Sequence, residues 1–382
     1  MKHYNVIIIG AGASGCMCAL TTKNKSVAII DCGKTIAKKI MVTGNGRCNL
    51  TNMEASSKFY NANIDKYLNK FNVHDTLEFF ESFGLETYAD DEGRVYPISN
   101  SAKSVVDVIN MNLSKKIDFI SEQKVQTIQK NNDLFIVKTD KDEYSCKKLV
   151  ISTGGNALKS QIEALGVACS EFIPSLVALK CKNCKDLNGV KVSNVKVSAK
   201  NKCGETKAEI GEILFKDNGL SGIVIFNIST LFARKNNWNG KIQIDLLPQI
   251  SLNELIMKLE KRKQLNVNID KIFVGMFANA LANEIFIQSR INTNGKTLSL
   301  SDENIIKLAK TIKNLTFECE SFYDNNQVYS GGVVLKDLND NLMSKKVPNL
   351  YFTGEVIDVD GECGGFNLQW AWTSGHIVGE CL

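Results

Sequence analysis

Three glycines near the start of the chain have the spacing of a loop that binds phosphate through its backbone. Gly10 permits a tight turn, Gly12 lets the backbone approach a pyrophosphate, and Gly15 lets the following helix pack close to the preceding strand. Ala13 and Ser14 would then begin that helix, whose N-terminal N–H groups and partial positive charge attract phosphate. The spacing therefore favours binding of a pyrophosphate-containing cofactor.

An acidic residue stands where a dinucleotide site needs one. The apolar run Val6–Ile9 precedes the glycines, and a second run, Val27–Ile30, is followed directly by Asp31. Strand, glycine turn, helix, strand and acid is the order of a dinucleotide-binding unit, in which the carboxylate accepts hydrogen bonds from ribose hydroxyls. The alternative is a signal peptide, but three glycines would interrupt its apolar core. The sequence therefore predicts a dinucleotide site.

The composition is that of an ordinary globular protein. Of 382 residues, 44% are hydrophobic and 23% charged, and the net charge is +5. The basic residues are nearly all Lys, which argues against a dedicated nucleic-acid binder, because Arg is the usual reader of base edges. No run approaches the roughly 18 continuous apolar residues of a membrane span. We therefore expect a cytoplasmic protein with a small-molecule substrate and no specific nucleic-acid or membrane partner, and leave its oligomeric state open.

The twelve cysteines are scattered, and we expect most of them to be reduced and buried. Cys181 and Cys184 form a Cys-x-x-Cys pair that invites a metal or redox interpretation. Zinc would need two further ligands, and only Cys203 lies near in sequence. The three histidines are dispersed, and His376 is expected to pack rather than to catalyse. No metal site is predicted.

The pattern of apolar residues predicts an α/β chain that is interrupted by an insertion. Residues 1–174 and 326–382 would form one domain, with a β-rich subdomain at 175–249 and a helical subdomain at 250–325 between them. The run Ile223–Ile228 is expected to be a strand of the β-rich part. A capping box, Ser251 to Glu254, predicts a helix that continues to about residue 263, and a second helix is expected over Ile272–Ile287.

The C-terminal stretch carries a resemblance to a known family. Residues 350–355 read Leu-Tyr-Phe-Thr-Gly-Glu, and residues 358–371 contain a long Gly-Gly-Phe-Asn motif. With residues 44–49, 220–222 and 331–333, they resemble the HI0933-like flavoproteins, a family of NAD(P)/FAD-dependent oxidoreductases. That family includes a flavoprotein implicated in bile-acid dehydroxylation and members with an aminoacetone-oxidase label. The resemblance covers nearly the whole chain.

The resemblance implies a fold and a cofactor. The fold would be a Rossmann-like FAD-binding domain of the two-dinucleotide type, with an inserted region that is part β-barrel-like and part helical. FAD would bind non-covalently, and NAD(P)H would bind transiently as an electron donor or would not bind at all. Glu355 would accept hydrogen bonds from the ribityl hydroxyls, Lys39 could meet a phosphate, and backbone N–H groups at Gly364–Phe366 would face the flavin.

The flavin itself is expected to carry the chemistry, with Arg47, Asn49 and Cys363 as weak catalytic candidates. Arg47 and Asn49 are equally well explained as residues that stabilise their loop. The predicted cofactor-binding set lies mainly in glycine-rich turns and at strand ends: Gly10, Gly12, Ala13, Ser14, Gly15, Asp31, Lys39, Gly44, Gly46, Arg47, Cys48, Val125, Thr153, Gly154, Gly354, Glu355, Gly364, Gly365, Phe366 and Asn367.

These features predict an oxidoreductase that passes hydride from NAD(P)H through flavin N5 to a small, apolar carbonyl or alkene-type substrate. The chain departs from the family where Lys216, Asp217 and Asn218 replace a common Thr-His, and where Phe366 replaces a usual Tyr. A histidine acid or base is therefore absent from the first position, and no phenol is offered at the second. Two alternatives stay open: a flavin-dependent tRNA-modifying enzyme, and an FAD-binding protein without turnover.

Overall fold

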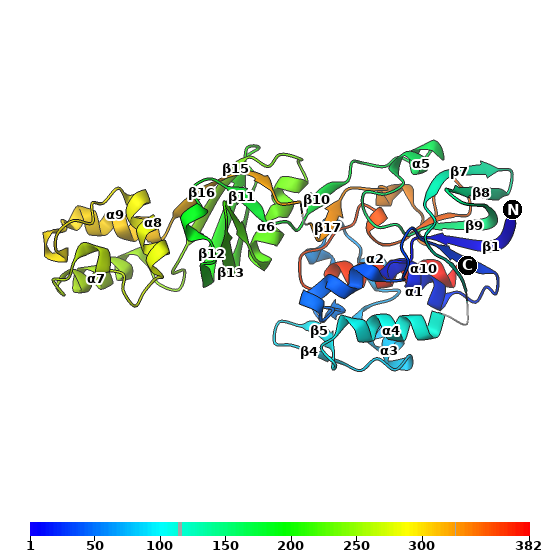
Figure 1. The fold of residues 1–382 in the computed structure, drawn as a ribbon, viewed down its shortest axis with the longest axis horizontal. Helices are drawn as coiled ribbons and strands as arrows, with labels where there is room; N and C mark the ends of the chain where they lie inside the picture. Colours follow the sequence, from blue (N-terminus) through cyan, green and yellow to red (C-terminus); the bar gives the residue numbers. More distant parts are fainter. Residues whose placement is uncertain (114–116, 325) are drawn as a thin grey trace. The chain divides into compact units, whose positions relative to one another are not determined.

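The computed structural model describes residues 1–113, 117–324 and 326–382, which divide into two compact units (Figure 1). Unit 1 comprises Met1–Ile173 and Val328–Leu382, and unit 2 comprises Pro174–Gln327. The short strands β10 (Ile173–Ser175) and β17 (Val328–Ser330) lie where the chain passes from one unit to the other. The expected boundary at residue 325 lies outside the described residues, and the four-part division stays a prediction.

A twisted mixed sheet forms the centre of unit 1, in the strand order β6–β2–β1–β9–β8–β7, with β18 pairing with β9. Strands β6, β2, β1, β9 and β18 pair in parallel with one another, whereas β8 pairs antiparallel with both β9 and β7. The apolar runs of the sequence are buried here because helices and loops cover both faces of the parallel strands. The strand bounds are β1 (Lys2–Ile9), β2 (Val27–Ile30), β6 (Asp118–Ile120), β7 (Val125–Asn131), β8 (Leu134–Thr139), β9 (Glu143–Ile151) and β18 (Leu350–Phe352).

Two helices from opposite ends of the chain, α1 (Ala13–Thr21) and α10 (Phe366–Glu380), pack together in unit 1. A side chain at Gly375 would lie 2.4 Å from the carbonyl oxygen of Ser14, so the close approach requires glycine there. Indole N–H groups fix α10 further, because Trp370 donates to Gly354 O and Trp372 donates to Leu50 O. The remaining elements of unit 1 are α2 (Asp65–Leu68), α3 (Val73–Ser82), α4 (Ala102–Leu113), α5 (Lys159–Ala164) and a small sheet of β3 (Thr51–Asn52), β5 (Arg94–Pro97) and β4 (Thr87–Ala89).

Unit 2 contains a closed barrel in the strand order β11–β14–β13–β12–β15–β16. Its strands are β11 (Leu179–Cys181), β12 (Lys191–Asn201), β13 (Thr206–Lys216), β14 (Gly219–Ser221), β15 (Gly240–Asp245) and β16 (Leu315–Phe322). Alternate side chains such as Val197, Phe215 and Ile242 are fully buried, which is the period-2 pattern of strands with one buried face. The predicted β-barrel-like insertion is confirmed.

The strand expected at Ile223–Ile228 is wrong, because these residues begin helix α6 (Ile223–Ala233), which packs against β13. Ile225, Ile228 and Phe232 are fully buried and follow one another at helical spacing. A continuous apolar run does not distinguish a buried strand from a buried helix. Gly222, at φ 111°, lets the chain turn from β14 directly into α6.

Three helices, α7 (Leu252–Lys263), α8 (Asn279–Ser289) and α9 (Asp302–Ile312), form the rest of unit 2. The capping box that begins α7 is confirmed, since Ser251 Oγ accepts the Glu254 N–H and the Glu254 carboxylate accepts the Ser251 N–H. The helix expected from Ile272 begins only at Asn279, because Gly275 adopts a left-handed φ of 81°. Within the described residues, no helix is both long and apolar enough to cross a membrane.

Candidate functional site

The glycine loop after β1 leaves a space beside the start of α1. Side chains at Gly10 and Gly15 would lie 2.5 and 2.1 Å from backbone oxygens, so the fold itself requires glycine at both positions. A Cβ at Gly12 would meet only Ser152 O, at 3.9 Å. Gly12 is the N-cap of α1, no described side chain caps the helix, and its first turn holds no acid. Space, helix dipole and backbone N–H groups together fit a pyrophosphate.

Asp31 connects this loop to the end of β2. Its Oδ2 accepts the N–H of Ala11 and its Oδ1 accepts the N–H of Gly33, each at 2.6 Å. Each carboxylate oxygen keeps a further lone pair for a ribose hydroxyl. The buried Val125 begins β7 close by, because the N–H of Gln123, two residues earlier, donates to Asp31 O at 3.0 Å. Asp31 therefore fixes the glycine loop and can also present acceptors at its edge.

Lys39 and Glu355 meet at the carboxyl ends of β9 and β18. Lys39 Nζ lies 3.1 Å from Glu355 Oε2, and Glu355 Oε1 accepts the N–H of Tyr329 at 2.6 Å. A Cβ at Gly154 would lie 3.7 Å from the same Glu355 oxygen. Next to it, Thr153 Oγ1 is buried and has no hydrogen-bond partner among the described residues. An unsatisfied oxygen of this kind fits a site whose partner is a ligand.

The start of α10 forms a second cradle. Gly365 is the N-cap of this helix, at φ 101°, and no described side chain caps it. A Cβ at Gly365 would lie 2.5 Å from Thr51 O and 2.8 Å from Asn49 Oδ1. Asn49 Oδ1 is buried and also lacks a hydrogen-bond partner among the described residues. The structure therefore places Asn49 beside the helix N-terminus predicted to face the flavin.

The side chains of Phe366 and Asn367 position the loop before α10. Asn367 Oδ1 accepts the N–H of Gly361, and its Nδ2 donates to Gly361 O, both at 2.8 Å. Phe366 is buried and stacks on Phe59 with ring centroids 4.3 Å apart. Both side chains are therefore engaged within the protein, and the cofactor role predicted for this stretch would require its backbone N–H groups.

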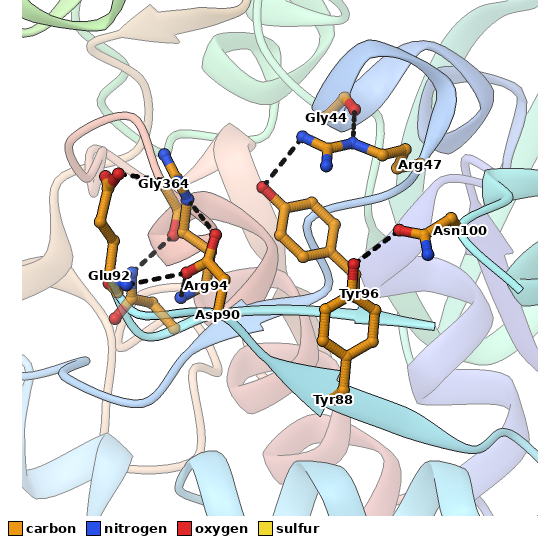
Figure 2. A network of polar contacts seen from close by, with 10 residues as sticks. Gly44, Arg47, Tyr88, Asp90, Glu92, Arg94, Tyr96, Asn100 and Gly364 are labelled. Atoms are coloured by element: carbon orange, nitrogen blue, oxygen red, sulfur yellow. Dashed lines mark hydrogen bonds and ion pairs between the residues drawn. The ribbon is translucent and has the colours of Figure 1, made fainter. Parts of the chain in front are cut away.

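The guanidinium of Arg47 lies beside Tyr96 (Figure 2). The guanidinium carbon is 4.4 Å from the ring centroid, one Nη is 3.5 Å from the Tyr96 hydroxyl, and Nε donates to Gly44 O at 3.3 Å. Burial raises the pKa of Tyr96, so the phenol stays protonated at neutral pH. Sequence reasoning missed Tyr96, because no motif marks it and only the pairing of β5 with β3 brings it to the loop at 44–49.

Hydrogen bonds and ion pairs lie between the β4–β5 hairpin, Asn52 of β3 and the loop before α10 (Figure 2). Asn52 Nδ2 donates to Gly364 O at 3.0 Å, and Arg94 pairs with both Asp90 and Glu92 in the β4–β5 hairpin, at 2.8 and 2.9 Å. The network holds the turn of the hairpin in one conformation. It therefore supports the second cradle without contributing a group to it.

Of the thiols predicted near the cofactor, Cys48 is placed where it cannot react readily. Cys48 is fully buried, which raises its pKa to about 12, so it holds its proton at neutral pH. Cys363 is half-buried, and all twelve cysteines are unbridged. His376 stacks on Phe71 with ring centroids 3.9 Å apart, and burial lowers its pKa. The described residues contain no group of three or more His, Cys, Asp or Glu side chains arranged to hold a metal ion.

Comparisons with known proteins agree with this fold. The model of the HI0933-like protein Rossmann domain matches residues 4–381. A 3-dehydro-bile acid delta(4,6)-reductase of Clostridium scindens is 32% identical over 407 residues, covering 98% of this chain and 97% of that protein. A ribosomal RNA dihydrouridine synthase of Haemophilus influenzae is 29% identical over 403 residues, covering 98% of each.

Among solved structures, a 3-ketosteroid delta1-dehydrogenase of Sterolibacterium denitrificans superposes with a TM-score of 0.51 over 99% of both chains. Its sequence identity is 10%, so the likeness concerns the fold alone. The predicted fold class, a Rossmann-type FAD-binding domain with an inserted barrel, is confirmed. The residues of unit 1 also fit FAD, because they provide the space at Gly12, two helix N-termini that no described side chain caps, and two buried oxygens without a partner among the described residues.

Proposed function

The chain belongs to the HI0933-like family, and from that premise we propose that it reduces a small, apolar substrate with electrons that a nicotinamide donates to FAD. It is a flavoprotein oxidoreductase by family and fold. The observation that carries the proposal is the second cradle, where the uncapped start of α10 and the unpartnered Asn49 Oδ1 lie together. Both groups suit a polar, electron-accepting ring rather than packing.

Unit 1 would bind FAD along its whole length. The α1 N-terminus at Gly12 would hold the pyrophosphate, and Asp31 would hold the ribose of the adenosine. Glu355 would accept ribityl hydroxyls, and Lys39, already paired with it at 3.1 Å, would balance its charge and approach the phosphates. Thr153 Oγ1 is a further partner for the bound cofactor, because nothing among the described residues satisfies it.

FAD, when bound, supplies the two-electron chemistry by accepting a hydride from reduced nicotinamide and delivering it to a substrate. The α10 N-terminus would favour that state by placing partial positive charge beside the ring. Arg47 adds a full positive charge near the same loop, held in place by the ring of Tyr96. Tyr96 Oη keeps its proton at neutral pH, because burial raises its pKa.

The substrate we propose is an apolar ring system with a carbon–carbon double bond conjugated to a ketone. The support is the relative from Clostridium scindens, whose name describes a reductase of a 3-dehydro-bile acid and which aligns over nearly the full length of both chains. A conjugated ketone accepts hydride at carbon and a proton elsewhere. This chemistry agrees with a site that has a cofactor cradle and few titratable groups.

A second candidate function is modification of a base in RNA. A relative named as a ribosomal RNA dihydrouridine synthase supports it, and so does the charge of unit 2. Residues 174–327 contain 22 Lys and Arg against 15 Asp and Glu, a net charge of +7, although the whole chain carries only +5. A basic region of this size favours contact with a polyanion. The predicted absence of a nucleic-acid partner therefore needs its own test.

An anaerobic reduction experiment separates these functions. The purified holoprotein is mixed with NADH or NADPH, and loss of the oxidised flavin absorbance is followed. The reduced protein is then offered a 3-keto steroid acid with conjugated double bonds or, in parallel, ribosomal RNA. We expect one nicotinamide to bleach the flavin and the steroid to restore its absorbance. Failure of both nicotinamides contradicts the donor, whereas reoxidation by RNA alone, with dihydrouridine formed, favours the second candidate.

A further inference from the structure

Three buried cysteines come together in the barrel of unit 2. Cys181 ends β11, Cys184 follows it after one turn, and Cys319 lies in β16. Their exposed fractions are 3%, 0% and 2%. The sequence shows only the first two as a pair, and the fold supplies Cys319 as the third. Cys203, their neighbour in sequence, is exposed instead.

Strand register pairs Cys181 with Cys319 in the antiparallel pair β11–β16, directly after an irregularity in the ladder between Lys180 and Cys181. The Lys182 N–H donates to Glu318 O at 3.0 Å, so residues 182 and 318 form the hydrogen-bonded pair and Cys181 and Cys319 form the adjacent non-hydrogen-bonded one. Cα atoms in such pairs lie about 4.5 Å apart, with their side chains close together. Disulfides span Cα separations of roughly 4.4 to 6.8 Å.

Both thiols lie on the interior face of the barrel. Cys319 continues the buried alternation of Leu315 and Phe317, while Glu318 between them is exposed. The neighbouring thiols of Cys184 and Cys319, together with burial, raise the pKa of Cys181 above its ordinary value. Cys181 is therefore the central thiol, within reach of both partners.

We propose that Cys181 and Cys319 form a reversible cross-strand disulfide, which oxidised glutathione closes and which two molecules of reduced glutathione reopen as they become oxidised glutathione. The oxidant is a small disulfide such as oxidised glutathione. Cys181, after losing its proton, attacks one sulfur of the oxidant and releases one glutathione thiol. Cys319 then attacks the Cys181 sulfur and releases the second. Two electrons and two protons leave the pair, and the oxidant becomes two thiols.

The bond would join the two strands nearest to the ends of unit 2, since β11 follows Pro174 closely and β16 ends shortly before Gln327. A disulfide that closes so long a loop restricts the unfolded chain and raises resistance to unfolding. Because Cys181 is buried and holds its proton, the exchange would be slow and would follow local opening of β11.

Peptide mapping of the oxidised full-length holoprotein tests the proposal. The protein is equilibrated with reduced and oxidised glutathione over a range of ratios, its free thiols are alkylated, and it is digested with trypsin. Cleavage after Lys182 separates Cys181 from Cys184, so each of the three possible bonds gives a different linked peptide. We expect the Cys181–Cys319 link, and an oxidised form that unfolds at a higher temperature than the reduced form.

The matched control is Cys203→Ser, which should keep the link and the temperature shift, whereas Cys319→Ser should lose both. Alkylation of all three thiols under conditions that oxidise the exposed Cys203 would overturn the proposal. A map containing only a Cys181–Cys184 link would overturn it as well. The wild-type map decides the question even where Cys319→Ser does not fold. None of these readouts depends on flavin reduction, so they stand apart from the proposed function.

Discussion

Unit 1 and unit 2 offer different chemistry in the same chain. In the part of unit 1 that the structure describes, there are glycine turns, helix starts that no side chain caps and buried oxygens without hydrogen-bond partners. Its 24 basic and 26 acidic residues nearly balance. Unit 2 has a closed barrel, a net charge of +7 and a cluster of buried thiols. The candidate cofactor site of unit 1 therefore depends on backbone geometry, which short sequence motifs reveal. The thiol cluster of unit 2 depends on contacts between distant segments, which only the fold reveals.

The largest expected effect is loss of FAD binding in Gly12→Val. A side chain at Gly12 meets only one atom within 4 Å in the structure, so the protein should fold and the side chain should take the place of the pyrophosphate. We expect FAD affinity to fall by more than roughly 100-fold. Fluorescence titration of the apoprotein with FAD measures this affinity. An unchanged affinity would show that the pyrophosphate does not bind at this loop.

The matched variant Gly15→Ala separates folding from binding within one loop. Its Cβ would lie 2.1 Å from Gly10 O, so the backbone itself must move. We expect the apoprotein to unfold at a clearly lower temperature, which Gly12→Val should not do. If the two variants unfold alike, the distinction between a fold-required and a ligand-required glycine fails.

Core truncation in each unit tests the independence of the two regions. Ile8→Ala in β1 and Ile242→Ala in β15 each remove a fully buried side chain, and each should cost about 2–5 kcal/mol of unfolding free energy. We expect only Ile8→Ala to lower the temperature at which flavin is released. Circular dichroism and flavin fluorescence, recorded on the same heating ramp, compare the two. Equal flavin release in both variants would show that the units unfold as one.

Asp31→Ala should have a smaller effect on the cofactor. It removes an acceptor for the adenosine ribose, worth about 1.5–3 kcal/mol of binding for a charge-assisted pair. It also removes the carboxylate that accepts hydrogen bonds from the N–H groups of Ala11 and Gly33, so the apoprotein should lose some stability. Titration with FAD and with FMN, which lacks the adenosine, distinguishes the effects, because only the FAD affinity should depend on the ribose contact. Equal losses of affinity for FAD and FMN would show that Asp31 only stabilises the loop and does not bind the ribose.

The smallest effect concerns pH. Burial lowers the pKa of His376 in the folded state, so as pH falls through the ordinary histidine value of about 6.5 the unfolded chain takes up a proton that the folded chain does not. Stability should therefore decrease on acidification, by less than about 1 kcal/mol from this partly exposed group. His376→Phe, which keeps the stacking on Phe71, should flatten the dependence of urea midpoint on pH between 5 and 7.5 relative to wild type. An identical slope would assign the effect to other groups.

Local signals predicted much of unit 1. The strands at Val6–Ile9 and Val27–Ile30, the glycine loop and the acid after β2 all followed from short stretches, because neighbouring residues alone determine these features. In unit 2 the helix α7 followed from the capping box between Ser251 and Glu254. Local sequence was sufficient wherever period or turn chemistry was strong.

The rest depended on contacts between distant segments. The apolar run that begins at Ile223 has no periodicity that distinguishes a helix from a strand. In the fold it is a helix that packs against β13. Tyr96 reached Arg47 through strand pairing, and Cys319 reached Cys181 through barrel closure. No spacing in the sequence predicts such pairs, so they could be found only in the fold.

The central claim is that unit 1 binds FAD without a covalent bond. Identifying the flavin that the purified protein carries tests this claim most directly. The protein is denatured by heat, the precipitate is removed, and the released chromophore is identified by chromatography and mass. We predict a yellow protein that releases intact FAD, with none left on the polypeptide. A colourless protein that takes up no FAD but binds NAD tightly would contradict the account.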